Sequence, residues 1–123
     1  MNIELTYTII PCADTVIASH FYNRIFNFKS VDETNKESLV QVNEKLTLKL
    51  EENEEYTNTQ FTFEVDDEYF DLILKNIKKE KLLFGSSITD FENKKVYEDF
   101  QKKEFYFLDP NSHLFNIITF IKD

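Results

Sequence analysis

The sequence has few basic residues relative to acidic ones, and it has no second cysteine. Lys and Arg number 14 against 23 Asp and Glu, which gives a net charge of -9 at pH 7. Such a chain repels a phosphate backbone, so nucleic acid is not an expected partner. Cys12 is alone and cannot form an intrachain disulfide. Because nothing indicates an oxidising compartment, we expect a cytoplasmic protein.

Signals for membranes and for phosphate loops are also missing. The sequence contains no apolar run of 18 residues, and residues 1–5 carry no basic region, so neither membrane insertion nor secretion is expected. Gly85 is the only glycine. A glycine-rich phosphate loop and a nucleophile elbow are therefore excluded, and no paired-histidine helix or zinc-knuckle spacing occurs.

Aromatic residues are abundant although tryptophan is absent. The chain has 13 Phe and 6 Tyr in 123 residues, a length typical of one domain that buries about two-thirds of its unfolded surface. Most of these rings are expected in the core, and the others are expected to line an internal cavity.

The first half of the sequence predicts a strand, a helix and then three strands. Residues 3–10 are rich in Ile, Thr and Tyr, and they are predicted to form a strand that stops at Pro11. Asp14 is a good helix N-cap, and Asn27 suits the left-handed conformation that closes a helix. The predicted apolar face of this helix is Ile17, Phe21 and Ile25, with Tyr22 and Phe26 beside it, and strands are predicted at 28–33, 38–44 and 46–52.

The pattern begins again after an acidic connector. Residues 61–65 are strand-like, Asp66 and Asp67 are candidate caps, and a second helix presents Phe70, Ile73, Leu74 and Ile77 on one face. The polar stretch 86–103 suits either a strand with a long excursion or a lid over a cavity. An offset of 53 residues aligns Tyr7 with Gln60 and Asp14 with Asp67, in agreement with two tandem βαβββ units.

The clearest local signal is a hairpin near the end of the sequence. Two apolar runs, 105–108 and 114–118, are rich in aromatic and β-branched residues and flank the turn 109–113. Pro110 presets φ for the first inner position of the turn, and Asn111 tolerates the next.

These segments together resemble the vicinal oxygen chelate superfamily, which includes glyoxalase I, bleomycin- and fosfomycin-resistance proteins and extradiol dioxygenases. The resemblance is carried by residues 14–28, 63–67 and 105–116, although Asn27 and Ser112 stand where the family usually has glycine. It implies an α+β fold in one domain, residues 1–123. Two tandem βαβββ units, about 1–55 and 56–123, would form a curved mixed sheet around a cavity. The resemblance also implies a homodimer.

Enzymes of this superfamily hold a divalent metal with side chains from the first strand of each unit and from the last strand. The positions that correspond are Tyr7, Gln60 and Asn116. A phenol and two amides supply neither imidazole nor carboxylate, so no metal site is expected, although nonstandard ligands near Glu64 remain an alternative.

The leading hypothesis is a metal-independent protein that binds and sequesters a small molecule, such as a toxic or antibiotic compound with aromatic or cationic character. Tyr7, Phe105 and Phe107 would stack on the ligand, while directional hydrogen bonds would come from Gln60, Thr62, Glu64 and Asn116. One alternative is a metal-dependent lyase, isomerase or dioxygenase, and a weaker one is a partner-binding domain with a filled cavity.

Three further residues have side chains of types that often act in catalysis. His113 closes the hairpin turn, His20 lies beside the apolar face of the first helix, and Cys12 precedes that helix. No partner residue is identifiable for any of them, so a structural role is favoured for all three.

Overall fold

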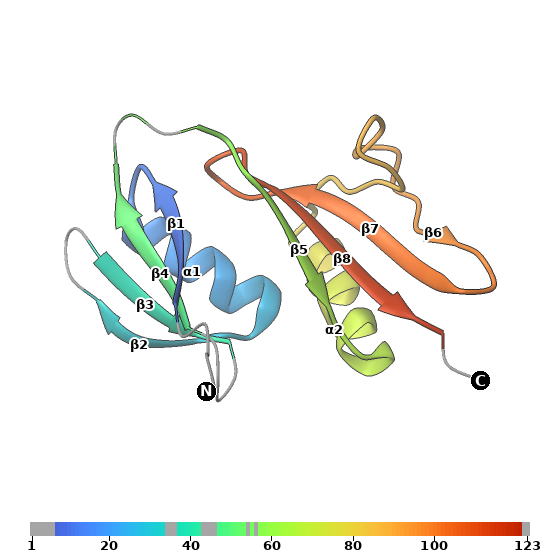
Figure 1. Ribbon diagram of the computed structural model, residues 1–123, viewed down its shortest axis with the longest axis horizontal. Helices are drawn as coiled ribbons and strands as arrows, with labels where there is room; N and C mark the ends of the chain where they lie inside the picture. Colours follow the sequence, from blue (N-terminus) through green and yellow to red (C-terminus); the bar gives the residue numbers. More distant parts are fainter. Residues whose placement is uncertain (1–6, 34–36, 43–46, 54, 56, 122–123) are drawn as a thin grey trace, which may run out of the picture. The chain divides into compact units, whose positions relative to one another are not determined.

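The computed structural model describes residues 7–33, 37–42, 47–53, 55 and 57–121. Its contacts divide the chain into two compact units, Met1–Thr57 and Asn58–Asp123, close to the predicted division at residue 55 (Figure 1). Each unit is a βαβββ motif with a four-stranded mixed sheet. No helix in the described ranges is long and apolar enough to cross a membrane.

The first unit contains one helix and four strands. They are β1 (Tyr7–Cys12), α1 (Thr15–Phe26), β2 (Lys29–Glu33), β3 (Glu37–Gln41) and β4 (Thr47–Glu52). The sheet order is β1-β4-β3-β2, in which β1 and β4 are parallel and the other pairs are antiparallel. The parallel pairing of β1 with β4 requires a long crossover connection, and this connection contains α1.

Both predicted caps of α1 are confirmed. The Asp14 carboxylate accepts hydrogen bonds from the N–H groups of Val16 at 2.9 Å and Ile17 at 3.0 Å, and Asn27 adopts the left-handed conformation with φ 58°. The predicted face needs one correction, because Ile17 is 58% exposed while Ala18 is buried. The buried stripe is therefore rotated by about one residue from the predicted one.

Pro11 does not end the first strand as predicted. Strand β1 continues through Pro11 to Cys12, opposite Glu51 and Glu52 of β4. Because β1 lies at the edge of its sheet, a missing N–H on the outer side costs no ladder hydrogen bond. Residues 3–6 of the predicted strand lie outside the described part of the chain.

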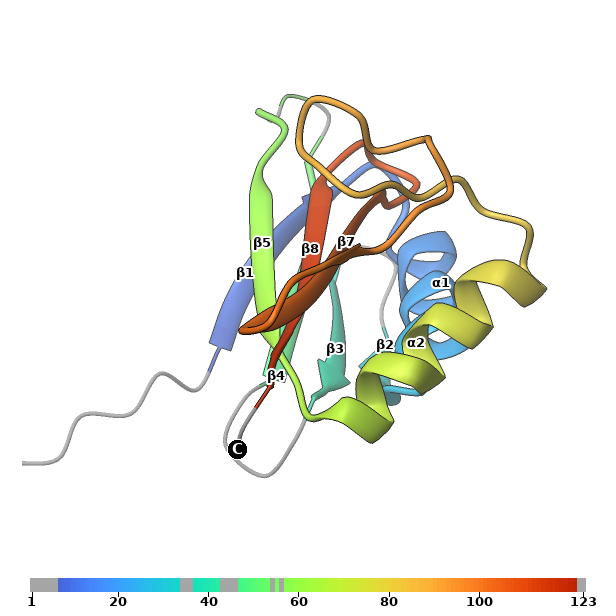
Figure 2. The same ribbon diagram turned by 90° about the vertical axis from the view of Figure 1, so that its right-hand side faces the viewer.

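The second unit repeats this arrangement. It contains β5 (Gln60–Glu64), α2 (Asp67–Lys79), β6 (Tyr97–Glu98), β7 (Lys102–Leu108) and β8 (Leu114–Phe120), with sheet order β5-β8-β7-β6. Figure 2 shows α2 along one face of this sheet. Asp66, not Asp67, is the N-cap and accepts from the Tyr69 N–H at 2.8 Å. The two helices are thus offset by 52 residues rather than 53, although the strands keep the offset of 53.

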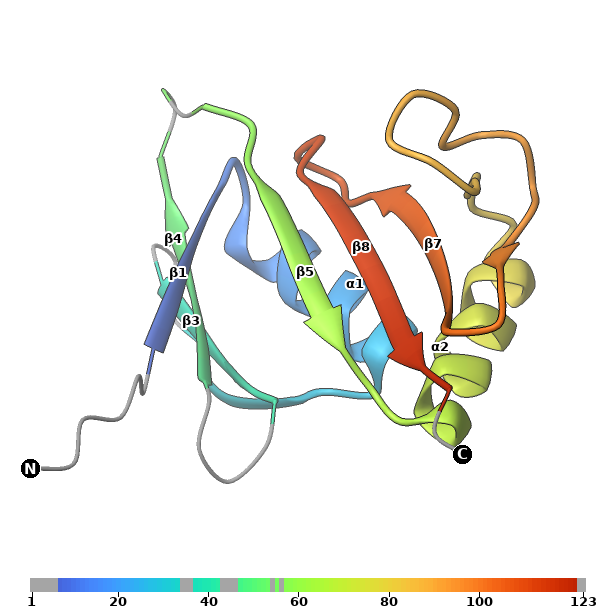
Figure 3. The ribbon, with the colours of Figure 1, turned by 45° about the vertical axis from the view of Figure 1, so that its right-hand side comes forward.

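The polar stretch before β7 is an interrupted edge strand. Gly85 exchanges two backbone hydrogen bonds with Tyr106, and Tyr97 then pairs with Glu104, nearer the start of β7. Figure 3 shows the segment between α2 and β7 as a long loop. Residues 86–96 form an excursion between these two contacts, the first of the two predicted alternatives. A Cβ at Gly85 would lie 2.3 Å from the Asp90 carbonyl oxygen, so only glycine fits there.

Candidate functional site

The sheet of the second unit has two chemically different faces. Neighbouring residues that pair across strands point to the same side, and successive residues alternate. Phe105 and Phe107 therefore share the face against α2, while Gln60, Thr62 and Glu64 lie on the opposite face. We call this second side the open face, because no helix of the same unit covers it.

The open face consists of three rows that cross β5, β8 and β7. The ladder register defines each row by its paired residues. The rows are Gln60–Leu114–Leu108, then Thr62–Asn116–Tyr106, then Glu64–Ile118–Glu104. Amides, hydroxyls and carboxylates thus surround the apolar side chains of Leu114 and Ile118.

Asn116 occupies the centre of this face. It is 5% exposed, and its side-chain Nδ2 donates to the Phe105 carbonyl oxygen at 3.4 Å. This contact holds the amide across the β7–β8 ladder. Gln60, Thr62 and Glu64 are exposed, so four of the predicted ligand-binding residues share one surface.

Sequence analysis missed two polar residues of this face, Glu104 and Tyr106. The Glu104 side chain is only 12% exposed, and its Oε1 lies 3.6 Å from Lys102 Nζ. Desolvation raises the pKa of Tyr106, as do the negative charge of Glu104 and a hydrogen bond to it. The hairpin register could have revealed both, because pairing Leu108 with Leu114 across the turn places Tyr106 opposite Asn116.

Phe105 and Phe107 require a correction. Both are completely buried on the helix side of the sheet. Phe105 makes an edge contact with Phe70 of α2 at a centroid distance of 5.1 Å, and Phe107 stacks on Phe115 at 5.5 Å. Their alternation with Tyr106 along β7 places them in the core, so the open face offers neither ring to a ligand.

Tyr7 belongs to the other unit. It begins β1 opposite Thr47, just as Gln60 begins β5 opposite Leu114, so the two positions are equivalent in register. Lys49 of β4 is likewise equivalent to Asn116 of β8. The 53-residue offset predicted from the sequence aligns the same two residues, Tyr7 and Gln60.

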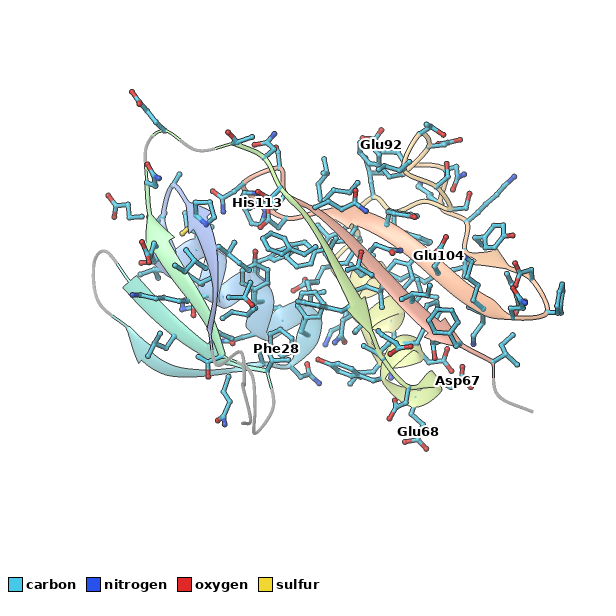
Figure 4. All side chains as sticks on the ribbon, viewed as in Figure 1. Phe28, Asp67, Glu68, Glu92, Glu104 and His113 are labelled. Carbon is cyan, nitrogen blue, oxygen red and sulfur yellow. The ribbon has the colours of Figure 1, made fainter. Side chains whose placement is uncertain are left out.

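His113 has the structural position that was favoured for it. Its imidazole is fully buried, and its Nδ1 accepts a hydrogen bond from the Thr59 N–H at 3.0 Å. The ring also makes an edge contact with Phe61 at 5.8 Å. Figure 4 shows His113 at the β7–β8 turn, where it ties the start of β5 to that turn.

The predicted hairpin turn is confirmed. Asp109 Oδ1 accepts from the N–H groups of Asn111 and His113, each at 2.9 Å. Ser112 has φ 63°, so it keeps the left-handed conformation usually supplied by glycine. Of the other two candidates, Cys12 is buried with its Sγ 3.6 Å from the Glu51 carbonyl oxygen, and His20 is exposed.

Comparison with known proteins identifies the architecture. No family model matches the sequence, and no curated protein matches it. Among solved structures, the oxidase ChaP-H2 is 21% identical with a TM-score of 0.87 over 97% of this chain and 94% of that one. The chain has the vicinal oxygen chelate fold.

Other structures with this fold are more distant in sequence. The fosfomycin resistance protein FosX from Mesorhizobium loti is 16% identical, with a TM-score of 0.71 over 97% of this chain and 93% of that one. Lactoylglutathione lyase from Agrobacterium tumefaciens is 12% identical, with a TM-score of 0.75 over 97% and 95%. The predicted α+β fold and its superfamily resemblance are thereby confirmed, and at these identities the likeness concerns the fold.

The residues at the metal positions of the vicinal oxygen chelate fold do not suit a divalent ion here. Gln60 and Asn116 are neutral amides, and the Asn116 amide already donates to the backbone of β7. Within the described ranges, no group of three or more His, Cys, Asp or Glu side chains is arranged to hold a metal. Zinc, nickel and iron normally require imidazole, thiolate or carboxylate donors, so this donor set does not fit them.

Proposed function

We propose that the protein binds a small organic molecule on the open face without a metal ion, and that it sequesters the molecule rather than transforming it. The observation that carries this proposal is the composition of the three rows. The Asn116 amide lies between the apolar side chains of Leu114 and Ile118, and Gln60, Glu64 and Glu104 lie on the neighbouring strands. Gln60 and Asn116 stand where the resemblance places metal ligands. Polar groups that fix the orientation of a ligand beside apolar contact surface are typical of small-molecule sites.

The side chains of the open face favour a neutral or cationic ligand. Gln60 and Asn116 offer amides, and Glu64 is an exposed carboxylate at one end of the face. Leu114 and Ile118 supply apolar contact, and Tyr106 is the ring in the three rows on which an aromatic group could stack. A net charge of -9 would repel an anion. A homodimer is part of the proposal and rests on the resemblance, and a cytoplasmic location is part of it and rests on the single cysteine.

The second candidate function is a metal-dependent lyase, isomerase or dioxygenase with nonstandard ligands. Two observations favour it: structures of the same fold include an oxidase and a lyase, and Glu64 and Glu104 occupy one row on either side of Ile118. This candidate requires a stoichiometric metal ion. Elemental analysis of protein purified without chelator or metal resin would exclude it if no metal were found.

The proposal is tested by thermal shift and calorimetry against aromatic amines, with and without chelator. A ligand specific for the native state raises Tm by mass action, and chelator should not change that rise. Gln60→Ala should weaken binding about fivefold, the usual effect of one hydrogen bond. Gln101→Ala removes the same side chain from an exposed site outside the open face and should leave affinity unchanged. A Tm that responds to metal and chelator alone would contradict metal-independent binding.

A further inference from the structure

A groove of about 730 Å³ lies in the second unit, beyond the third row of the open face, with which it shares Glu64. It is formed at the ends of β5 and β8, at the start of α2 and at β6. Its lining includes Glu64, Asp67, Glu98 and Lys103, together with the apolar side chains of Phe120 and Ile121. We propose that this groove is a second binding site, and that it takes an organic cation with an apolar body.

The charges of the groove favour a cation. Four carboxylates line it, those of Glu64, Asp66, Asp67 and Glu98, whereas Lys103 is its one ammonium group. Lys103 Nζ lies 2.6 Å from Asp67 Oδ1 and 3.9 Å from Asp71 Oδ1, so its charge is already neutralised by the helix. Glu64 and Glu98 are both exposed and remain available to attract a ligand with a positive charge.

The start of α2 would by itself favour an anion, because the helix dipole places positive partial charge there. In this protein that end is already occupied by acids. Asp66 accepts the Tyr69 N–H, and Asp67 and Glu68 stand in the first turn (Figure 4). The excess of carboxylates therefore determines the charge of the preferred ligand, which is positive.

The apolar wall explains why a simple inorganic cation would not fill the groove. Phe120 is 47% exposed and Ile121 44% exposed, and the groove also contacts Val65. An apolar body laid against Phe120 and Ile121 would remove this surface from water. The volume corresponds to a drug-sized molecule rather than a single ion. Charge and apolar surface thus specify the same class of ligand, an amphiphilic amine or quaternary ammonium compound.

Glu64 is the one residue that the groove shares with the rows of the open face, so binding in the groove does not require the function proposed there and is tested separately on the full chain. The probes are benzyltrimethylammonium, benzyl alcohol and benzenesulfonate, which share a ring and differ in charge. Binding of each is measured by calorimetry in low salt. The cation should bind, with the alcohol much weaker and the sulfonate without measurable heat. Raising the salt concentration should weaken binding of the cation, because the groove is open to solvent.

Two exposed positions provide the variants. Glu98→Gln should weaken binding of benzyltrimethylammonium about threefold, the effect of losing one solvent-exposed ion pair. Ile121→Ser should weaken it by about the same factor through lost apolar contact. Glu92→Gln removes an equal charge from the excursion and should have no effect, and Gln60→Ala on the open face should have none either (Figure 4).

Several results would overturn the inference. Equal losses in Glu98→Gln and Glu92→Gln would mean general charge attraction rather than a site. A loss in Gln60→Ala alone would place the probe on the open face. Binding of benzyl alcohol as tight as that of the cation, or no binding of any probe at millimolar concentration, would show that the groove does not recognise organic cations.

Discussion

The two units share one topology and one strand register, yet they differ in the side chains on the buried face of each sheet. The buried side of the first sheet is aliphatic, with Ile10, Val40, Leu48 and Leu50 all fully inaccessible. The buried side of the second sheet is aromatic, with Phe105, Phe107 and Phe115 packed on one another. The same backbone therefore accommodates two kinds of core, because the positions that point inward are set by the ladder rather than by side-chain type.

The open sides of the two sheets differ even more. At the centre of β4 stands Lys49, whose Nζ lies 3.5 Å from Glu51 Oε2, and its neighbour on β1 is Ile9. The equivalent positions in the second unit are Asn116 and Thr62. One sheet thus presents a charged pair beside an apolar residue, and the other presents neutral hydrogen-bonding groups. The site proposed on the open face combines these neutral groups with the carboxylates of Glu64 and Glu104 in the next row.

The largest expected effect comes from removing core side chains in each unit. Phe107→Ala should lower the free energy of unfolding by about 3–5 kcal/mol, and Leu50→Ala by about 2–5 kcal/mol, because both leave cavities in buried sites. Urea unfolding followed by far-UV circular dichroism measures both. If the two units unfold together, each variant moves one common transition.

The control for this comparison is Phe100→Ala. Phe100 is 85% exposed, so its loss should change the free energy of unfolding by less than about 0.5 kcal/mol. Two separate transitions, with only one shifted in each core variant, would instead show that the units are thermodynamically independent.

Removing the helix caps should have an effect of intermediate size on the free energy of unfolding. Asp14→Ala and Asp66→Ala should each destabilise the protein by about 1 kcal/mol. We expect the larger loss at Asp14, since its carboxylate accepts from the N–H groups of both Val16 and Ile17, whereas that of Asp66 accepts from the Tyr69 N–H. Matched Asp→Asn variants retain an acceptor oxygen and should recover most of the loss. A larger effect at Asp66 would show that counting bonds does not rank the two caps.

The smallest effect concerns ionisation in the second unit. Burial raises the pKa of Tyr69 to about 12 from the ordinary value of 10.0. The neutral phenol is therefore favoured in the folded state, and its contribution to stability is present below pH 10 and lost as the pH rises through 12. Tyrosinate absorbance should show a late component that Tyr69→Phe removes. A titration unchanged by that substitution would contradict the assignment.

Much of the fold could be predicted because local chemistry and tertiary packing agree at the decisive residues. Asp14 caps, Asn27 closes a helix, and the turn at Asp109 forms a hairpin, each for reasons contained in a few neighbouring residues. The prediction that the strand stops at Pro11 is wrong because an edge strand such as β1 tolerates proline. The local sequence does not reveal that β1 lies at the edge of its sheet.

The candidate site was predictable only in part, for a related reason. Gln60, Thr62, Glu64 and Asn116 were correctly placed on one surface because alternation along β5 and pairing with β8 determine it. Phe105 and Phe107 were assigned by ring chemistry without following the alternation along β7, which puts Tyr106 on the open face instead. Whether any of these residues binds a ligand stays a prediction for the experiments above.

The bridge between Gly85 and Tyr106 has a consequence for protein engineering. The excursion of residues 86–96 leaves the edge of β7 at Tyr106 and returns at Glu104, two residues further along the strand. Two residues of a strand span about 7 Å, so the ends of the excursion are close together and both are fixed by backbone pairing. A peptide grafted into this segment would therefore enter and leave the sheet at two fixed points, provided that the contacts of Asn93 with Ser86 and of Lys94 with Phe84 are kept.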